Sequence, residues 1–316
     1  MTKMSDSSSI RIGIIGTGAM GKNHLRVVHS IPEYRLTCAA DIDTQILDSA
    51  CEPYSISRYT NFKAMLDEVD GVMVSTPTIH HYEISRFFLE NKKHVLVEKP
   101  ITSTLEEADE LIEIAKKHNV VFAVGHLERF NPAVEYINPL VKRPLFIEVQ
   151  RLGSFSPRSL DVDVIMDLMI HDLDIILQWD QSGIKQINAS GIPIISNKID
   201  IANVRLQFNS RMVANITASR VSQKKTRKLR IFQKNNYISL DYQKRSVKTY
   251  TLTNGNIVED IPEIKEIEPL KNLWMNFYKT ITTGNECNVT GTDGRNALEL
   301  ALRISEHIRK NIEDIR

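Results

Sequence analysis

Short apolar runs alternate with amphipathic stretches along the first 125 residues of the chain. The run Ile10–Ile15 ends in glycine, and residues 19–30 carry apolar side chains at helical spacing. Further strands are expected at residues 36–40, 71–75, 94–97 and 120–124, and helices at 80–90 and 105–118. Strands that alternate with helices favour a parallel sheet covered on both faces, because their crossovers are right-handed. We therefore expect a doubly wound α/β domain over residues 10–125, preceded by a disordered polar tail over residues 1–9.

Period-two alternation replaces this pattern in the second part of the chain. Residues 145–153 and several runs between 184 and 252 are strand-like, and Val204, Leu206 and Phe208 share one face of such a run. Asn209-Ser210 and Asn235-Asn236 are typical of hairpin turns. Helices are expected at residues 162–179, 270–282 and 294–312. The pattern predicts an α+β domain over residues 126–316, in which helices cover one face of an open, mostly antiparallel sheet.

Composition and charge exclude several classes of protein. The chain has 316 residues, of which 42% are hydrophobic and 25% charged, enough to bury the cores of two domains. Forty basic and thirty-nine acidic side chains leave a net charge of +1, which favours neither nucleic acid nor an anionic membrane as a partner. The three cysteines and nine histidines lack the spacing of a disulfide framework or a metal site. No apolar run approaches the length of about 20 residues that spans a membrane, so we expect a cytoplasmic protein without membrane insertion.

Three glycines mark the turn between the first strand and the first helix. In Gly16-Thr-Gly18-Ala-Met-Gly21, the first glycine permits a tight turn, the second admits a pyrophosphate and the third allows close packing. Such glycines can serve turn geometry alone, but Asp41, at the end of the second strand, stands where a carboxylate can hold ribose hydroxyls. Asp41 and Asp43 would repel a 2′-phosphate. The sequence therefore predicts an NAD site and makes NADP the less favoured cofactor.

Two polar motifs lie beyond the glycine turn. Glu98-Lys99-Pro100 follows an expected strand, at the sheet edge where open α/β sheets bind ligands, although a solvated salt bridge would give the same pattern. Asp167 and His171 are four residues apart, so a helix would place both on one face. Taken alone, such a pair is more often a surface pair or a helix cap.

These motifs occur together, in an order typical of one enzyme family. GTGAMG, Thr76-Pro77 with His81, VLVEKP and DLMIHDLD resemble the successive signatures of the glucose-fructose oxidoreductase, inositol dehydrogenase and rhizopine catabolism (Gfo/Idh/MocA) family of sugar dehydrogenases. The resemblance implies a Rossmann domain joined to a substrate domain whose open sheet mediates homo-oligomers, either dimers or tetramers. The implied cofactor-binding residues are Gly16, Gly18, Ala19, Met20, Gly21, Asp41, Ser75, Thr76, Pro77, His81, Glu98 and Lys99.

The same resemblance implies the catalytic residues. Lys99 matches the family's active-site lysine, and Asp167 and His171 match its Asp-x-x-x-His pair. Oxidation of an alcohol needs a base for the hydroxyl proton, and imidazole titrates near neutral pH, so His171 is expected to be that base. Lys99 would hydrogen-bond the reacting oxygen, and Asp167 would orient the lysine or the substrate. Retention of all three residues disfavours the alternative of a non-catalytic NAD-binding sensor or scaffold.

Departures from the common family pattern bear on the substrate. Met169 stands where many members have a small residue, residues 125–132 are GHLERFNP, and Arg151 and Arg158 flank Gly153-Ser-Phe-Ser-Pro. This combination is similar to the subgroup of UDP-N-acetylglucosamine 3-dehydrogenases, which supply a 3-keto nucleotide sugar to a partner aminotransferase in lipid A biosynthesis. The expected substrate contacts are Lys99, Arg129, Asn131, Arg158 and His171.

Alternatives remain open for the arginines and for the substrate. Arginines beside the pocket would suit a diphosphate, but Arg129 and Arg158 could equally pair with local carboxylates such as Glu128. A dehydrogenase of a free polyol or monosaccharide would need no diphosphate contact. We interpret the basic run as a charged, solvated strand in preference to a phosphate site; it comprises Lys224, Lys225, Arg227, Lys228 and Arg230.

Overall fold

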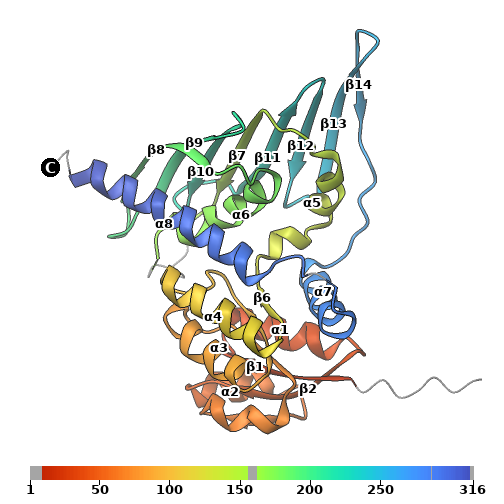
Figure 1. Ribbon diagram of the computed structural model, residues 1–316, viewed down its shortest axis with the longest axis vertical. Coiled ribbons are helices and arrows are strands. Elements are labelled where there is room, and N and C mark those ends of the chain that lie inside the picture. The colour runs from red at the N-terminus through yellow and green to blue at the C-terminus, as the bar shows by residue number, and fades with distance from the viewer. Residues whose placement is uncertain (1–8, 156–161, 286, 314–316) are drawn as a thin grey trace, which may run out of the picture. The chain divides into compact units, whose positions relative to one another are not determined.

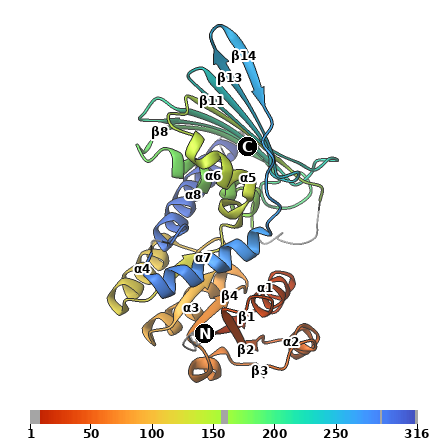
Figure 2. The ribbon, with the colours of Figure 1, turned by 90° about the vertical axis from the view of Figure 1, so that its right-hand side faces the viewer.

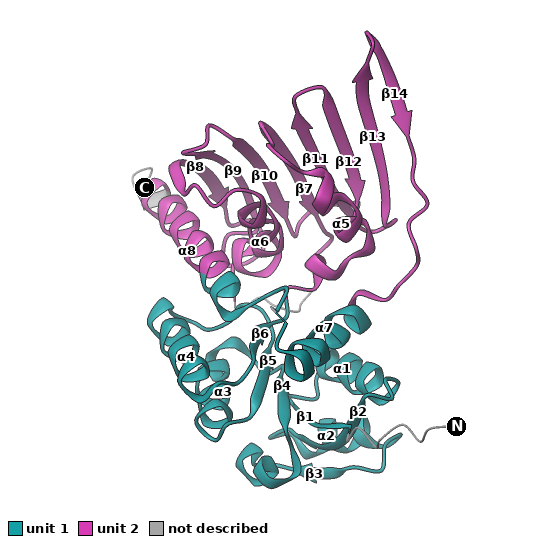
Figure 3. Ribbon diagram, turned by 45° about the vertical axis from the view of Figure 1, so that its right-hand side comes forward, with its two compact units in different colours: residues 1–125, 270–295 teal, residues 126–269, 296–316 magenta. Residues whose placement is uncertain are grey.

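The computed structural model describes residues 9–155, 162–285 and 287–313, which form two compact units. Residues 1–125 and 270–295 belong to the first unit, and residues 126–269 and 296–316 to the second (Figure 3). The predicted tail lies outside the described residues, except for Ser9. No helix in the described part of the chain is long and apolar enough to cross a membrane.

The first unit contains a six-stranded parallel sheet, as the alternation of strands and helices predicted. The strand order is β3-β2-β1-β4-β5-β6, and every neighbouring pair is parallel. Figure 2 shows α1 and α2 on one side of the sheet and α3 and α4 on the other. The strands are β1 (Ile10–Ile15), β2 (Tyr34–Ala40), β3 (Ser57–Tyr59), β4 (Gly71–Val74), β5 (His94–Val97) and β6 (Phe122–Val124). The helices are α1 (Ala19–His29), α2 (Thr44–Cys51), η1 (Phe62–Glu68), η2 (Thr78–His80), α3 (His81–Glu90), α4 (Leu105–His118) and α7 (Pro269–Thr283).

Helix α7 packs in the first unit, although the sequence placed residues 270–295 in the second domain. The hydroxyl of Tyr34, at the start of β2, donates to the carbonyl oxygen of Trp274 at 2.7 Å. The indole N–H of Trp274 donates to Nδ1 of the buried His24 in α1 at 3.0 Å. The partners in these two hydrogen bonds are 240 and 250 residues apart, so the periodicity of a single helix or strand could not predict either bond.

The second unit contains an eight-stranded sheet, in which the pairing of β7 with β10 is parallel and the other pairings are antiparallel. The predicted open, mostly antiparallel sheet is thus confirmed, and its order is β14-β13-β12-β11-β7-β10-β9-β8. The strands are β7 (Phe146–Leu152), β8 (Ile184–Ile192), β9 (Ile201–Phe208), β10 (Val213–Ser219), β11 (Thr226–Gln233), β12 (Asn236–Asp241), β13 (Ser246–Thr253) and β14 (Asn256–Asp260).

Helices cover one face of this sheet, which we call the covered face. Alternate strand residues point to it: in β9, Ala202, Val204, Leu206 and Phe208 are buried, while Asn203 and Arg205 are exposed. Figure 1 shows α5, α6 and α8 over this face, and apolar residues of all three pack with the buried strand residues. The helices of this unit are η3 (Leu127–Phe130), α5 (Pro132–Ile137), η4 (Asn138–Leu140), η5 (Ile165–Met169), α6 (Ile170–Trp179) and α8 (Gly291–Glu313), the last of which begins in the first unit.

The helix predicted at residues 162–179 is not regular. Residues Ile165–Met169 (η5) form a π-helical turn, and the α-helix α6 begins only at Ile170. Asp163 accepts a hydrogen bond from the amide of Met166 at 3.0 Å and another from the hydroxyl of Ser305 at 2.9 Å. This tertiary contact accompanies the looser winding, and single π-helical turns of this kind are frequent at functional sites.

Candidate active site

The glycine turn after β1 is built by close backbone approaches. Gly16 has a φ of 85°, in the left-handed region that side chains disfavour. A Cβ atom on Gly21 would lie 2.0 Å from the carbonyl oxygen of Gly16, so the first turn of α1 can close against the loop only with glycine there. A Cβ atom on Gly18 would meet nothing within 4 Å. The backbone therefore packs tightly around Gly16 and Gly21, whereas the space beside Gly18, just before α1, is unfilled.

A pocket of about 300 Å³ opens beside this turn, at the carboxyl ends of β1, β2 and β4. Gly18, the residue before α1, makes no side-chain cap, so the first amides of the helix remain available to an anion. The buried hydroxyl of Thr76 in the pocket wall makes no hydrogen bond within the described part of the chain. These features fit a dinucleotide. The lining residues are Ile15, Gly16, Gly18, Ala40, Asp41, Ile42, Thr60, Phe62, Ser75, Thr76, Pro77, His80, Glu83 and Ile84.

Asp41 gives one wall of this pocket a fixed negative charge. Its Oδ2 accepts hydrogen bonds from the amide of Thr17 at 2.7 Å and from the Thr17 hydroxyl at 3.1 Å, while Oδ1 accepts from the amide of Asp43. Asp43 in turn caps α2. A carboxylate held here is suited to ribose hydroxyls and repels a 2′-phosphate.

Several predicted cofactor residues do not line this pocket. Ala19, Met20, Gly21, Glu98 and Lys99 are absent from the lining, and His80 lines the pocket in place of the predicted His81. The two ring nitrogens of His81 lie 2.8 Å from the carbonyl oxygen of Pro100 and 2.9 Å from that of Thr76. His81 thus ties the Thr76-Pro77 turn to the loop after β5, because its side chain is buried between them.

Lys99 follows a glutamate that is held by a buried histidine. The indole of Trp274 can only donate, so Nδ1 of His24 accepts its hydrogen bond and Nε2 carries the proton. That Nε2 lies 3.1 Å from Oε1 of Glu98, whose Oε2 accepts from the amide of Lys99 at 3.2 Å. Burial by itself would raise the pKa of Glu98, but the hydrogen bond from His24 and the charge of Lys99 lower it. The carboxylate stays ionised, and the contribution of His24 and Trp274 could not be inferred from any local motif.

The second unit carries the Asp167 and His171 pair on η5 and α6. Both residues are half-buried, Asp167 within the π-helical turn and His171 in the first turn of α6. The ring of His171 meets the ring of buried His126 edge to face, with centroids 6.2 Å apart. Sequence reasoning missed His126, whose only signal was its place in the segment 125–132.

Two predicted substrate contacts, Arg129 and Asn131, have partners within the fold. Arg129 donates from Nε and Nη2 to the two carboxylate oxygens of Asp174, at 2.7 and 2.8 Å. For Arg129, the structure thus shows the carboxylate pairing that the alternative allowed, with Asp174 and not Glu128 as the partner. Asn131 caps α5 by accepting from the amide of Ala133, and its side-chain amide donates to Glu128 and to the carbonyl oxygen of Tyr242. Arg158 lies outside the described residues.

Arg151 and Asp172 form a second buried ion pair next to His171. The guanidinium donates to Asp172 at 2.5 and 2.8 Å and to Glu128 at 3.0 Å, and it lies 4.9 Å from the centre of the Tyr242 ring. Burial by itself would lower the pKa of Arg151, but Asp172 and then Glu128 raise it well above its ordinary value. Two arginines thus bind the two aspartates that follow His171 in the chain, which fixes the start of α6.

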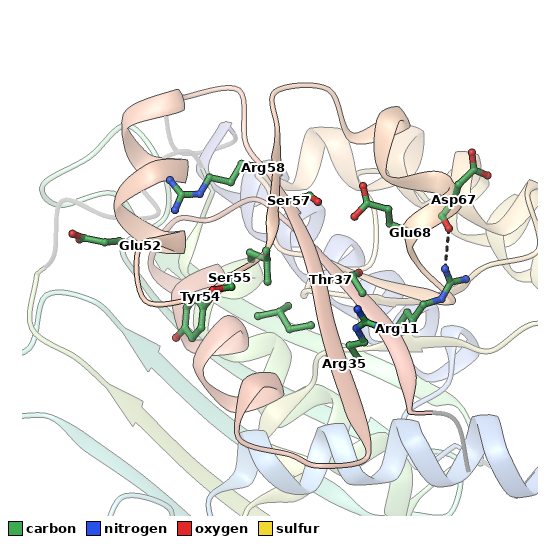
Figure 4. Close-up of a pocket in the computed structure, with 12 residues that line it drawn as sticks. Arg11, Arg35, Thr37, Glu52, Tyr54, Ser55, Ser57, Arg58, Asp67 and Glu68 are labelled. Atoms are coloured by element: carbon green, nitrogen blue, oxygen red, sulfur yellow. Dashed lines mark hydrogen bonds between the residues drawn. The ribbon is translucent and has the colours of Figure 1, made fainter. Parts of the chain in front are cut away.

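A larger pocket of about 790 Å³ lies elsewhere in the first unit (Figure 4). It faces the amino-terminal halves of β1 and β2, whereas open α/β sheets bind ligands at the carboxyl ends. Arg11 in its wall is bound to Asp70 and to the carbonyl oxygen of Asp67, and Arg58 is bound to Asp48. Two of its arginines are therefore already engaged by carboxylates outside the lining. Within the described ranges, no group of three or more His, Cys, Asp or Glu residues could hold a metal ion.

Strand order and glycine turn together define the class of protein. The order β3-β2-β1-β4-β5-β6 places the turn where the order reverses, which is the dinucleotide site of a doubly wound fold. The pocket at this point and the second, mostly antiparallel unit are those of a two-domain, nicotinamide-dependent oxidoreductase.

Known proteins give the same assignment and extend it to a family. The oxidoreductase family with an NAD-binding Rossmann fold (Gfo/Idh/MocA) matches residues 10–126. The chain is 32% identical to the UDP-N-acetylglucosamine 3-dehydrogenase of Acidithiobacillus ferrooxidans over 302 residues, which cover 93% of this chain and 96% of that protein. It is 25% identical to the myo-inositol 2-dehydrogenase of Thermotoga maritima over 97% of each chain. This chain belongs to the Gfo/Idh/MocA oxidoreductase family.

Solved structures share the whole fold. A structure of the Acidithiobacillus ferrooxidans enzyme superposes with a TM-score of 0.91 at 31% identity, over 95% of this chain and 98% of that chain. Levoglucosan dehydrogenase in complex with NADH superposes with a TM-score of 0.85 at 19% identity, over 96% and 98% of the two chains. The first unit is accordingly an NAD-binding Rossmann fold, and the protein is an oxidoreductase.

Proposed function

We propose that this enzyme oxidises the C3 hydroxyl of a UDP-N-acetylglucosamine-type nucleotide sugar to the 3-keto sugar, with NAD as the acceptor. The observation that carries the substrate assignment is the 32% identity, over 93% of the chain, to an enzyme of that name. The pocket beside Gly16, Gly18 and Asp41 supports the cofactor, which when bound accepts the hydride that leaves the substrate carbon.

The chain's own residues would handle the proton and the charge. His171 would take the hydroxyl proton on its imidazole while the carbon–hydrogen bond breaks. Lys99 would donate a hydrogen bond to the same oxygen and favour its developing negative charge, since an ammonium stabilises an oxyanion. Asp167 would orient the lysine or the sugar hydroxyls. Both His171 and Asp167 sit on a segment that buried ion pairs hold in place, as this chemistry requires.

An assay with purified protein and NAD tests the assignment directly. NADH formation is measured with UDP-N-acetylglucosamine, myo-inositol and glucose at matched concentrations. We expect the highest kcat/KM for the nucleotide sugar. Preference for myo-inositol would favour the free-polyol alternative, which the myo-inositol 2-dehydrogenase relative supports. NAD binding without turnover of any of the three would favour a sensor or scaffold.

We further propose that an aminotransferase consumes the ketone. A 3-keto sugar carries the carbonyl group that such an enzyme converts to an amine. Mass spectrometry of a reaction supplemented with a nucleotide-sugar aminotransferase and an amino donor should detect a 3-amino nucleotide sugar. Its absence, with the ketone present, would count against this partner.

We also propose that the face of the eight-stranded sheet opposite the helices, the open face, joins copies of the chain into a homo-oligomer. Phe146, Phe232, Tyr237 and Tyr250 are neighbours across β7, β11, β12 and β13, with ring centroids 5.8, 4.8 and 5.3 Å apart. Such a row of partly exposed rings is typical of an interface. Light scattering should give the mass of a dimer or tetramer, and Phe232→Asp should lower it. The mass of a single chain for the native protein would contradict the proposal.

A further inference from the structure

Strand β11 splits the basic run of the sequence between two faces of the sheet. Leu229 and Ile231 are buried on the covered face, and Arg227 shares their side of the strand because side chains alternate. Lys228 is exposed on the open face, as a solvated strand requires. The side chain of Arg227 is only 32% exposed, so the interpretation of the run as solvated does not extend to it.

Arg227 lies directly opposite a buried arginine, Arg151. The register of β11 and β7 pairs Arg227 with Arg151, so both guanidinium groups point to the covered face from neighbouring strands. Like charges in this position destabilise a sheet. Because Arg151 is buried and Arg227 is partly buried, both charges need acceptors nearby.

The nearby carboxylates compensate Arg151 far better than Arg227. Both oxygens of Asp172 accept from Arg151, and Oε1 of Glu128 accepts from Arg151 at 3.0 Å. The same Oε1 lies 3.7 Å from Nη1 of Arg227, beyond hydrogen-bond distance, and this is the ion pair that the described residues provide for Arg227. Arg227 therefore shares an acceptor that is already occupied.

The electrostatic environment of Arg227 agrees with this geometry. Burial, followed by the like charge of Arg151, lowers the pKa of Arg227, against the opposing effects of Glu128, Asp172 and Asp167. Its register partner Arg151 is bound to Asp172 in the first turn of α6, so Arg227 lies near the proposed catalytic segment. An anion beside Arg227 would supply an acceptor at hydrogen-bond distance, which Glu128, 3.7 Å away, does not.

We propose that Arg227 binds the diphosphate of the nucleotide-sugar substrate and thereby distinguishes it from free sugars. The guanidinium is planar and can donate two parallel hydrogen bonds to phosphate oxygens, which suits it to this ligand better than lysine. The inference rests on the proposed function and assigns to it a specificity residue that is neither in a recognised motif nor among the expected substrate contacts.

The test compares Arg227→Gln with Arg227→Lys and with Lys228→Gln as the matched control. Lys228→Gln removes one positive charge from the same strand, but on the open face. For each enzyme we would measure KM and kcat for UDP-N-acetylglucosamine, the Kd of UDP and of NADH by calorimetry, and the thermal midpoint. UDP is the probe because it presents the diphosphate without the sugar.

Arg227→Gln should raise KM for the nucleotide sugar and the Kd of UDP about 10- to 100-fold, the range for loss of charge-assisted hydrogen bonds. Its kcat, NADH affinity and thermal midpoint should stay unchanged, because a contact made equally in ground and transition states affects KM alone. Arg227→Lys should recover part of the UDP affinity, and Lys228→Gln should match the native enzyme.

Two results would overturn the inference. One is native UDP affinity in Arg227→Gln; the other is a lowered thermal midpoint with parallel losses of UDP and NADH affinity, which a purely structural role predicts. A native enzyme that neither binds UDP nor oxidises the nucleotide sugar would contradict the proposed function itself. Native activity with an unaffected Arg227→Gln variant would contradict only this inference.

Discussion

Replacement of Lys99 by Met or of His171 by Ala is expected to lower kcat/KM by about 10²- to 10⁴-fold, the contribution typical of a positioned acid–base or oxyanion-stabilising group. Lys99 follows β5 and is absent from the lining of the cofactor pocket, and His171 lies in the second unit. The Kd of NADH should therefore change little in either variant. Stopped-flow or steady-state kinetics, together with NADH fluorescence titration, would measure both quantities.

Lys116→Met is the matched control for the lysine, because Lys116 is exposed on α4 of the same unit. It should retain native kinetics. Native turnover in Lys99→Met or His171→Ala would contradict the roles proposed for these residues. A loss of activity accompanied by an equal loss of NADH affinity would indicate a structural role instead.

Arg151→Met is expected to lower the free energy of unfolding by about 3–5 kcal/mol, because it leaves a buried carboxylate without its partner. Asp172 is fully buried and both its oxygens accept from Arg151. The other arginine nearby, Arg227, lies 3.7 Å from Glu128 and pairs with that carboxylate, so it does not replace Arg151 beside Asp172. Urea denaturation followed by circular dichroism would measure the change.

Two further variants distinguish the stability lost by leaving Asp172 unpaired from the net stability that the Arg151–Asp172 ion pair contributes. The double variant Arg151→Met with Asp172→Leu should regain much of the lost stability, since apolar replacements of buried ion pairs are often neutral. Arg58→Met breaks an exposed pair with Asp48 and should cost no more than about 1 kcal/mol. Equal losses in the single and double variants would contradict the role of the unpaired carboxylate.

Features within single elements were sufficient to predict several strands and helices and the glycine turn. The bounds of β1, β5 and α4 match the expected ranges, because each is a strand or helix with its own periodicity and clear ends. Helix α4 begins at a capping box between Thr104 and Glu107, a signal contained within four neighbouring residues. The glycine spacing is local in the same sense: the clash that a Cβ atom at Gly21 would meet is with Gly16, five residues away.

The partners of charged residues could not be predicted in this way. Arg129 finds Asp174 across 45 residues and Arg151 finds Asp172 across 21, and the identity of each partner depends on how η3 and β7 pack against α6. The sequence offered Glu128 as a partner for Arg129, and only packing directed that carboxylate to Arg151 instead. His24, Glu98 and Trp274 form their chain across the first unit for the same reason.

By itself, the sequence determined the two-domain α/β architecture, the glycine turn with Asp41, and the motifs that identify the family. These properties follow from the periodicity and spacing of residues within single elements. Only the tertiary structure showed that residues 270–295 pack in the first unit. It also showed that Arg129 and Arg151 form ion pairs with Asp174 and Asp172, and that the side chain of Arg227 points to the covered face. The reason is physical: a local pattern reports whether a side chain is polar, whereas its partner, burial and remaining charge are set by neighbours brought together only on folding.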